Sequence, residues 1–247
     1  MFGMSRPAVH DLSVAILAGG MATRLLPVTR TIPKCMVEVA GRPFIEHQLG
    51  LLSRGGFRKV VLCLGHLGEQ VAEHVGDGSA FGVEAAYSHD GPVPLGTGGA
   101  LRQALPLLTD PFFVLYGDSY LPVDFRPVAE GFLAGRDLGC MTVHRNDGRW
   151  DRSNVWFEQG RIRLYHKRGP DARMRHIDYG LGMLSHAAFR HAPAQGPFDL
   201  AALYETLVKD GRMTGHEVAS RFYEIGSHDG LAELDALLRG TSDPSRP

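Results

Sequence analysis

Residues 14–34 constrain the fold more than any other part of the chain, because an apolar run leads directly into two glycines and then into two cations. The first five residues of this stretch are apolar and short enough to form a buried strand. Gly19 and Gly20 follow, and they can adopt backbone angles closed to other residues, so that consecutive N–H groups converge on phosphate oxygens. Arg24 and Lys34 can neutralise charge on those oxygens. The stretch therefore predicts a cradle for a nucleoside triphosphate.

The two commonest phosphate-binding motifs do not fit this stretch. A P-loop ends in Gly-Lys-Ser/Thr, whereas the lysine here lies fourteen residues beyond Gly20. A dinucleotide fingerprint needs G-x-G-x-x-G, which residues 19–24 do not supply. A plain Gly-Gly turn between a strand and a helix is the simplest alternative, but it does not account for the positions of Arg24 and Lys34.

The stretch resembles the signature of the sugar-1-phosphate nucleotidyltransferases, L-A-G-G-x-G-T-R-L-x-P-x-T followed by P-K. Ala22 stands where that family usually has its third glycine. The resemblance implies catalytic roles for Arg24 and Lys34, which would grip the phosphates. It also implies that the residues around the glycine turn bind the nucleotide: Leu17, Ala18, Gly19, Gly20, Met21, Arg24 and Lys34.

A second glycine-rich segment, residues 94–101, resembles the L-G-T-x-x-A loop with which this family holds the base and ribose. The resemblance implies that the main chain of Gly96 and Thr97 contacts the base, and that Gly65 and its loop also take part in nucleotide binding. We expect the next two glycines, 98 and 99, to let the chain turn into the following helix. The alternative is a helix N-terminus capped by Thr97.

A buried strand candidate ends in Gly117 and Asp118, which places a carboxylate at the carboxyl edge of the sheet, where ligands of open α/β sheets collect. Mg²⁺ takes one or two carboxylates plus phosphate oxygens, so Asp118 is the first candidate metal ligand and a candidate catalytic residue. Gly117 beside it is a candidate nucleotide-binding residue. Residues 222–227 resemble the family's aromatic-x-Asp-Ile-Gly-Thr segment, with Glu224 in the usual place of the aspartate. The resemblance implies that Glu224 is the second metal ligand. A turn-capping role for Asp118 and a structural salt bridge for Glu224 are the alternatives.

Residues 163–168 fall where relatives carry Glu-Lys-Pro, and the resemblance implies that Lys167 binds the phosphate of the acceptor sugar. His166 replaces the acid of that motif, and a solvated basic loop is the alternative. Residues 177–181 resemble a sugar-contacting segment, so that Asp178 could bond sugar hydroxyls and Gly180 could let the backbone approach. A buried strand with a satisfied aspartate is the alternative.

Short apolar runs alternate with helical patterns along the chain, which predicts an α/β fold of the Rossmann-like three-layer α/β/α class with a mixed, mostly parallel central sheet. The second half has a more antiparallel character, with a hairpin predicted about residues 159–160. The strands that we expect are 14–18, 59–64, 83–87, 112–116, 138–143, 154–157, 161–165, 177–184 and 222–225. The helices that we expect are 43–55, 68–75, 99–108, 128–133, 200–208 and 231–238.

No repeat or low-complexity linker divides the chain, so we expect one nucleotidyltransferase domain over residues 1–247. Within it, residues 12–118 would form the nucleotide-binding half and residues 119–240 the sugar-phosphate-binding half, followed by a flexible tail, 241–247.

Composition excludes several classes of partner. Lys plus Arg number 26 against 27 for Asp plus Glu, so no overall basic field favours a nucleic acid or an anionic membrane. The three cysteines are widely spaced, which predicts reduced thiols in a cytoplasmic protein instead of disulfides or a zinc site. No apolar run is long enough for a signal peptide or a membrane span. The oligomeric state is left open.

The family resemblance implies a Mg²⁺-dependent enzyme whose substrates are a nucleoside triphosphate and a sugar 1-phosphate and whose products are a nucleotide sugar and pyrophosphate. Residues 64–69 and 95–101 resemble segments of the small bacterial enzymes that activate D-glycero-D-manno-heptose 1-phosphate with GTP. Together with the compact chain, this resemblance favours GTP with a heptose 1-phosphate, for surface-polysaccharide synthesis. Guanylyl transfer to mannose 1-phosphate and uridylyl transfer to N-acetylmuramic acid 1-phosphate are alternatives. A catalytically silent sugar-nucleotide sensor and an NAD(P)-dependent sugar dehydrogenase or epimerase are rivals from other classes.

Overall fold

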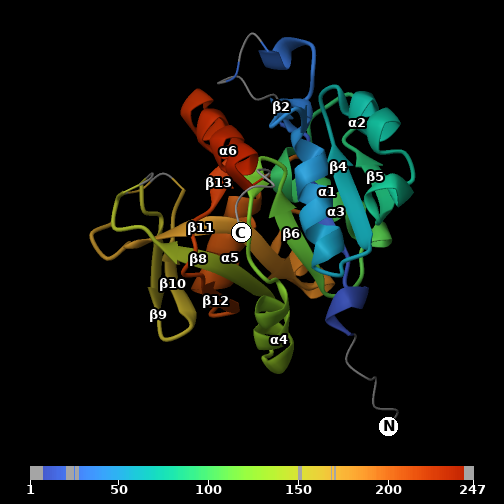
Figure 1. The fold of residues 1–247 in the computed structure, drawn as a ribbon. Coiled ribbons are helices and arrows are strands. Elements are labelled where there is room, and N and C mark those ends of the chain that lie inside the picture. The colour runs from blue at the N-terminus through green and yellow to red at the C-terminus, as the bar shows by residue number, and fades with distance from the viewer. Residues whose placement is uncertain are drawn as a thin grey trace.

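The structure is a computed structural model that describes residues 8–20, 25, 28–149, 152–167, 169 and 171–241. A nine-stranded sheet crosses the molecule in the order β5-β4-β1-β6-β11-β8-β12-β10-β9, and helices cover it (Figure 1). Its strands are β1 (Val14–Leu17), β4 (Lys59–Leu64), β5 (Glu84–His89), β6 (Phe112–Tyr116), β8 (Gly139–Arg145), β9 (Val155–Glu158), β10 (Arg161–Tyr165), β11 (His176–Leu184) and β12 (Met213–Glu217). The predicted fold class, an α/β fold with a mixed central sheet, is confirmed.

The first half of the sheet is parallel. Strand β1 pairs with β4 on one side and with β6 on the other, and β4 pairs with β5. Because parallel strands of this kind are buried on both faces, they read as continuous apolar runs, which is the pattern of Val14–Leu17. Their carboxyl ends lie at one edge of the sheet, and the loops that carry the predicted nucleotide motifs leave from this edge.

Two apolar layers lie on opposite faces of the sheet. One packs helices α1 (Phe44–Arg54), α2 (Gly68–Val75) and α4 (Arg126–Ala134) against the sheet, and the other packs α3 (Gly96–Ala104) and α5 (Leu200–Lys209). Successive strand residues alternate between these layers, since side chains of a strand point to opposite faces. Val14 and Ile16 belong to the first layer and Ala15 to the second.

A smaller apolar cluster lies at the edge of the sheet, where the last helix, α6 (His228–Thr241), packs near the short strands β2 (Glu38–Val39) and β3 (Arg42–Pro43). Ile225 and Leu234 are fully buried in this cluster. Two further short strands, β7 (Ser119–Tyr120) and β13 (Tyr223–Glu224), pair antiparallel beside it. This pairing brings the segment before α6 next to the segment after β6.

The second half of the sheet mixes directions. Strand β11 is antiparallel to both β6 and β8, and the predicted hairpin joins β9 to β10. Gln159 and Gly160 form its turn with φ angles of 50° and 72°. Strand β12 was not predicted, because its middle residue is Gly215 and only Met213 is buried and apolar. A Cβ on Gly215 would lie 2.6 Å from Phe157 Cε2, so the side chain of Phe157 from β9 fills the space that a side chain would take.

One local prediction is wrong. Gly98 and Gly99 do not lead into the helix, since α3 already begins at Gly96. Instead, Gly98 leaves room for Phe198, because an added Cβ would lie 2.2 Å from Phe198 Cε2. The backbone N–H groups of both glycines also donate to the carbonyl of Phe198.

Among the described residues, no helix is long and apolar enough to cross a membrane. The three cysteines, Cys35, Cys63 and Cys140, are buried and unpaired, and burial raises the pKa of each thiol to about 12. At this pKa the thiols are protonated at neutral pH, so we assign them no nucleophilic role.

Candidate active site

A cleft of about 710 Å³ opens at the carboxyl ends of β1, β4 and β6. Segments far apart in the sequence meet here. They line the crevice at the carboxyl ends of the strands, which is where ligands of open α/β sheets bind. Ten of the predicted site residues line the cleft: Leu17, Ala18, Gly19, Gly20, Lys34, Gly65, Gly96, Thr97, Gly117 and Asp118. Met21 and Arg24, which belong to the same predictions, lie outside the described residues.

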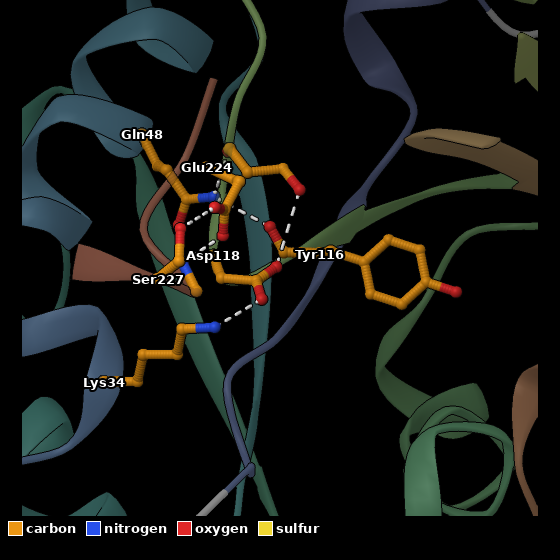
Figure 2. A network of polar contacts seen from close by, with 8 residues as sticks. Lys34, Gln48, Tyr116, Asp118, Glu224 and Ser227 are labelled. Atoms are coloured by element: carbon orange, nitrogen blue, oxygen red, sulfur yellow. Dashed lines mark hydrogen bonds and ion pairs between the residues drawn. The ribbon is translucent and has the colours of Figure 1, made fainter. Parts of the chain in front are cut away.

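Lys34 and Asp118 form an ion pair in this cleft. Nζ of Lys34 donates to Oδ2 of Asp118 over 2.6 Å, and the two side chains point toward one another in Figure 2. The Lys34 side chain is 16% exposed and that of Asp118 is 34% exposed, so the pair is partly shielded from water. The tertiary fold therefore brings together a cation from the first loop and an acid from the end of β6, 84 residues apart.

The turn that carries Asp118 is fixed to its neighbours through the backbone. Gly117 N–H donates to the carbonyl of Leu17 at the end of β1, over 3.0 Å. A Cβ on Gly117 would lie 2.5 Å from the same oxygen, so only glycine allows this approach. On the other side, Ile225 N–H donates to the carbonyl of Asp118 over 3.0 Å.

Glu224, the second predicted metal ligand, lies on β13 opposite Ser119. Its carboxylate accepts hydrogen bonds from the hydroxyl of Ser227, over 2.6 Å, and from the backbone N–H of Gly226. Ser227 in turn accepts from the N–H of Gly230 in the first turn of α6. The carboxylate thus stabilises the start of α6, where negative charge is favoured.

Two loops meet at the other wall of the cleft. A Cβ on Gly65 would lie 2.6 Å from the carbonyl oxygen of Gly19, so these residues approach as only glycines can. Asp90, which follows β5, also lines the cleft beside Gly96, and its Oδ2 accepts from Leu95 N–H over 3.1 Å. Burial raises the pKa of the Asp90 carboxyl, against the lowering effect of that hydrogen bond.

Thr97 connects the nucleotide motifs to the second half of the chain. Its hydroxyl donates to Oδ1 of Asp199 over 3.1 Å and accepts from Leu200 N–H over 2.8 Å. Thr97 therefore holds the start of α5 and does not cap its own helix. Oδ2 of Asp199 accepts from Nζ of Lys167 over 2.6 Å. Lys167 is thus connected by hydrogen bonds to the rim of the cleft, although it does not line the cleft itself.

Asp178 and Gly180 lie at a bulge in β11, next to the turn that carries Asp118. A Cβ on Gly180 would lie 2.8 Å from Ser119 Oγ, and its φ of 88° favours glycine. Gly180 N–H donates to Oδ1 of Asp178 over 3.0 Å. Burial raises the pKa of Asp178 to about 6, while this hydrogen bond and the charge of Lys167 act in the opposite direction.

Three tyrosines lie near enough to Asp178 for its charge to act on their phenols: Tyr116 from β6, Tyr165 from β10 and Tyr204 from α5. Burial raises the pKa of each phenol, and the negative charge of Asp178 raises it further. Tyr116 also lines the cleft, so this polar group adjoins the candidate nucleotide site. Because the pKa of each is raised, these three phenols are protonated at neutral pH and can donate or accept hydrogen bonds.

The donor set can be compared with what Mg²⁺ requires. Among the described residues, no group of three or more His, Cys, Asp or Glu side chains is placed so that it could hold a metal ion. A single aspartate in a cleft suits Mg²⁺, which takes few protein oxygens and completes its shell with water and substrate phosphate. Asp118 therefore fits a metal that enters with a triphosphate.

Sequence reasoning missed Asp90, Asp199 and Tyr116. Asp90 follows a parallel strand as Asp118 does, so the same rule about strand ends could have found it. Asp199 directly precedes a helix of which it is the N-cap, accepting from Ala201 N–H. Tyr116 ends an apolar strand and carried no signal of its own.

Comparison with known proteins gives a consistent grouping. Residues 13–147 match the model of the family described as nucleotidyl transferase. N-acetylmuramate alpha-1-phosphate uridylyltransferase of Neisseria meningitidis serogroup B is 43% identical over 115 residues, covering 46% of this chain and 50% of that protein. D-glycero-alpha-D-manno-heptose 1-phosphate guanylyltransferase of Campylobacter jejuni is 33% identical over 113 residues, with the same coverage of 46% and 50%. The matched segment thus spans about half the length of these two relatives.

Among solved structures, HddC from Yersinia pseudotuberculosis complexed with GMP-PN superposes with a TM-score of 0.76 and 22% sequence identity. The match covers 92% of this chain and 99% of that one. At this identity the similarity concerns the fold, which extends through both halves of the chain.

Proposed function

Because this chain belongs to the nucleotidyl transferase family, we propose that it transfers a nucleotidyl group from a nucleoside triphosphate to a sugar 1-phosphate, releasing pyrophosphate. The observation that carries the proposal is the Lys34–Asp118 pair in a glycine-lined cleft at the carboxyl edge of the sheet. A cation and a metal-binding acid at one point suit the approach of two anions, which otherwise repel each other.

Each part of the site would bind a different part of the two substrates. The glycine loop at residues 19 and 20 would receive the triphosphate through backbone N–H groups, and Lys34 would bind its phosphates. Arg24 would supply a second cation. When Mg²⁺ is bound at Asp118, it neutralises phosphate charge and polarises the phosphoryl group. The protein would otherwise act by holding the acceptor phosphate in line with the α-phosphorus.

Glu224 remains a proposed second ligand for the metal. Its carboxylate would have to leave Ser227 or reach the metal through a water molecule. Mg²⁺ retains several waters in protein sites, so a water-mediated contact suits its chemistry.

For the nucleotide we propose GTP, on the basis of Asp90. A carboxylate accepts hydrogen bonds only, and the Watson–Crick edge of guanine presents the N1–H and N2–H donors side by side. Uracil presents a single N–H between two carbonyl oxygens, and a carboxylate repels these oxygens. The acid beside Gly96 therefore supports guanine as the preferred base.

For the acceptor we propose a neutral, hydroxyl-rich sugar such as a heptose 1-phosphate. Lys167 would release the carboxylate of Asp199 and bind the phosphate in its place. Asp178 and Gly180 would contact the sugar. Above its pKa of about 6, Asp178 is negatively charged and accepts hydrogen bonds from hydroxyl groups. An acceptor with a carboxylate of its own, such as N-acetylmuramic acid 1-phosphate, would be repelled. Mannose 1-phosphate fits the same argument.

A pyrophosphate-release assay tests this function. GTP, UTP, ATP, CTP and dTTP are each combined with a panel of sugar 1-phosphates and Mg²⁺. We expect release with GTP and a neutral sugar phosphate, and a loss of at least about a hundredfold in Lys34→Ala or Asp118→Ala, as for removal of one electrostatic stabiliser. Wild-type turnover by either variant would refute the assigned roles.

A catalytically silent sensor is the second candidate, favoured by the hydrogen bonds that hold the Glu224 carboxylate on Ser227 and Gly226. A protein of this kind would bind a nucleotide tightly, and no combination in the same assay would release pyrophosphate.

A further inference from the structure

Gln48 contacts both sides of the turn that carries Asp118. It lies on α1 and is 1% exposed. Its Nε2 donates to the carbonyl of Tyr116 over 2.9 Å and to the carbonyl of Ser119 over 2.8 Å. These two residues flank the two-residue turn of Gly117 and Asp118 in the sequence. Figure 2 shows the Gln48 side chain beside Asp118.

The orientation of the Gln48 amide follows from its partners. Both are carbonyl oxygens, which only accept, so the NH₂ group must face them. The other end of the amide, Oε1, is buried without a hydrogen-bond partner among the residues that the structure describes. Leaving a buried acceptor unpaired is unfavourable, and an apolar side chain of similar size would avoid it. The unpaired Oε1 of Gln48 therefore lowers stability, and the two hydrogen bonds that Nε2 donates are what this glutamine contributes to the structure.

The backbone hydrogen bonds that hold the turn from its other sides use different groups of the turn. Leu17 binds the N–H of Gly117, and Ile225 binds the carbonyl of Asp118. Without Gln48, the carbonyls of Tyr116 and Ser119 would lose the amide group that donates to both, and their partial negative charges would repel each other. They would move apart, and the Asp118 carboxylate would move with the turn.

We propose that Gln48 is a positioning residue, which holds Asp118 in the geometry needed to bind a divalent cation with the triphosphate. The role rests on the proposed function, since it concerns the acid assigned to the metal. Gln48 lies on α1 and has no direct part in the chemistry.

The test is a comparison of metal affinity between the wild type and Gln48→Met, which keeps the size of the side chain and removes the donor. Mn²⁺ binding is measured by electron paramagnetic resonance in the presence of a non-hydrolysable GTP analogue. Residues that orient metal ligands typically change affinity by roughly 10- to 100-fold, so we expect Mn²⁺ to bind that much more weakly. The Mg²⁺ concentration for half-maximal pyrophosphate release should rise in parallel, with little change in the KM of the sugar phosphate.

A matched control separates positioning from general stability. His47 directly precedes Gln48 on the same helix, is also buried, and bonds the carbonyl of Val39 instead of the turn. We expect His47→Leu to lower the melting temperature and to leave the Mn²⁺ affinity unchanged. Equal Mn²⁺ affinity in the wild type and Gln48→Met, or an equal loss in His47→Leu, would overturn the proposal.

A second variant covers the case in which Gln48→Met does not fold. Gln48→Asn keeps the amide but is one methylene shorter, so it cannot reach both carbonyls, and we expect an affinity between those of the wild type and Gln48→Met. Unchanged affinity in Gln48→Asn would count against the proposal. If the wild type releases no pyrophosphate with any substrate pair, the proposed function fails, while the Mn²⁺ comparison still decides the role of Gln48.

Discussion

Nζ of Lys34 lies 2.6 Å from Oδ2 of Asp118, so the cation of the phosphate loop occupies the carboxylate that we assign to the metal. Two positive groups cannot share one carboxylate oxygen without repulsion. The arrangement implies that Lys34 leaves Asp118 for the phosphates when a nucleotide enters together with its metal.

This exchange predicts how Lys34 affects metal binding. In Lys34→Met the carboxylate of Asp118 loses its internal partner, and we expect Mn²⁺ to bind the nucleotide-free protein about tenfold more tightly, which corresponds to about 1.4 kcal/mol. Calorimetric titration with Mn²⁺ checks this, with Lys167→Met as the control that removes a more distant lysine. Weaker or equal binding in Lys34→Met would contradict the exchange.

Asp90 is predicted to determine the choice of base. Asp90→Asn replaces an acceptor-only group by one that also donates, so we expect the ratio of kcat/KM for GTP to that for UTP to fall by roughly 10- to 100-fold, the effect of about 1–3 kcal/mol of base discrimination. Steady-state pyrophosphate release with each nucleotide measures the ratio. A ratio equal to that of the wild type would exclude contact between Asp90 and the base.

The raised pKa of Asp178 predicts a pH dependence of stability. Its pKa is about 6 in the folded state and near the ordinary value of 3.8 when unfolded, so the folded state binds the proton more tightly. The free energy of unfolding therefore rises as the pH falls from 7 to 5, by about 1 kcal/mol from this group. Urea unfolding at both pH values should show this increase in the wild type and a smaller one in Asp178→Asn. Parallel changes in the two proteins would argue against a shifted Asp178.

Gly98 is predicted to be required for packing. In Gly98→Ala the new methyl group would meet Phe198 Cε2 at 2.2 Å, and we expect a loss of roughly 1–3 kcal/mol in the free energy of unfolding. Gly131 on α4 is the matched control, since nothing lies within 4 Å of an added Cβ there. Gly131→Ala should stabilise the protein by roughly 0.5–1 kcal/mol through helix propensity. Denaturant unfolding of both variants measures the difference, and equal stabilities would show that Phe198 can move aside.

Local sequence signals were sufficient for most of the elements. The strand Lys59–Leu64, apolar after its first residue, and the helix Phe44–Arg54 after Pro43 appear where their patterns place them. Burial periodicity and helix-start signals act over a few residues, so a local pattern is sufficient for such elements. Strand β12 could not be found in this way. It lies in the sheet because Gly215 makes room for Phe157, a contact with another strand that leaves no pattern in its own residues.

The candidate site divides in the same way. The glycines and the acid at the end of β6 could be identified from the sequence, since a strand followed by a polar turn specifies its own geometry. The sequence by itself determined that an α/β sheet would present glycine loops, a lysine and an acid at one edge. Only the tertiary structure decided that Lys34 pairs with Asp118, that Glu224 bonds the start of α6, and that Gln48 holds the turn of Asp118. These contacts join residues separated by many positions in the chain, and their partners are selected by the packing of whole elements, which local patterns do not encode.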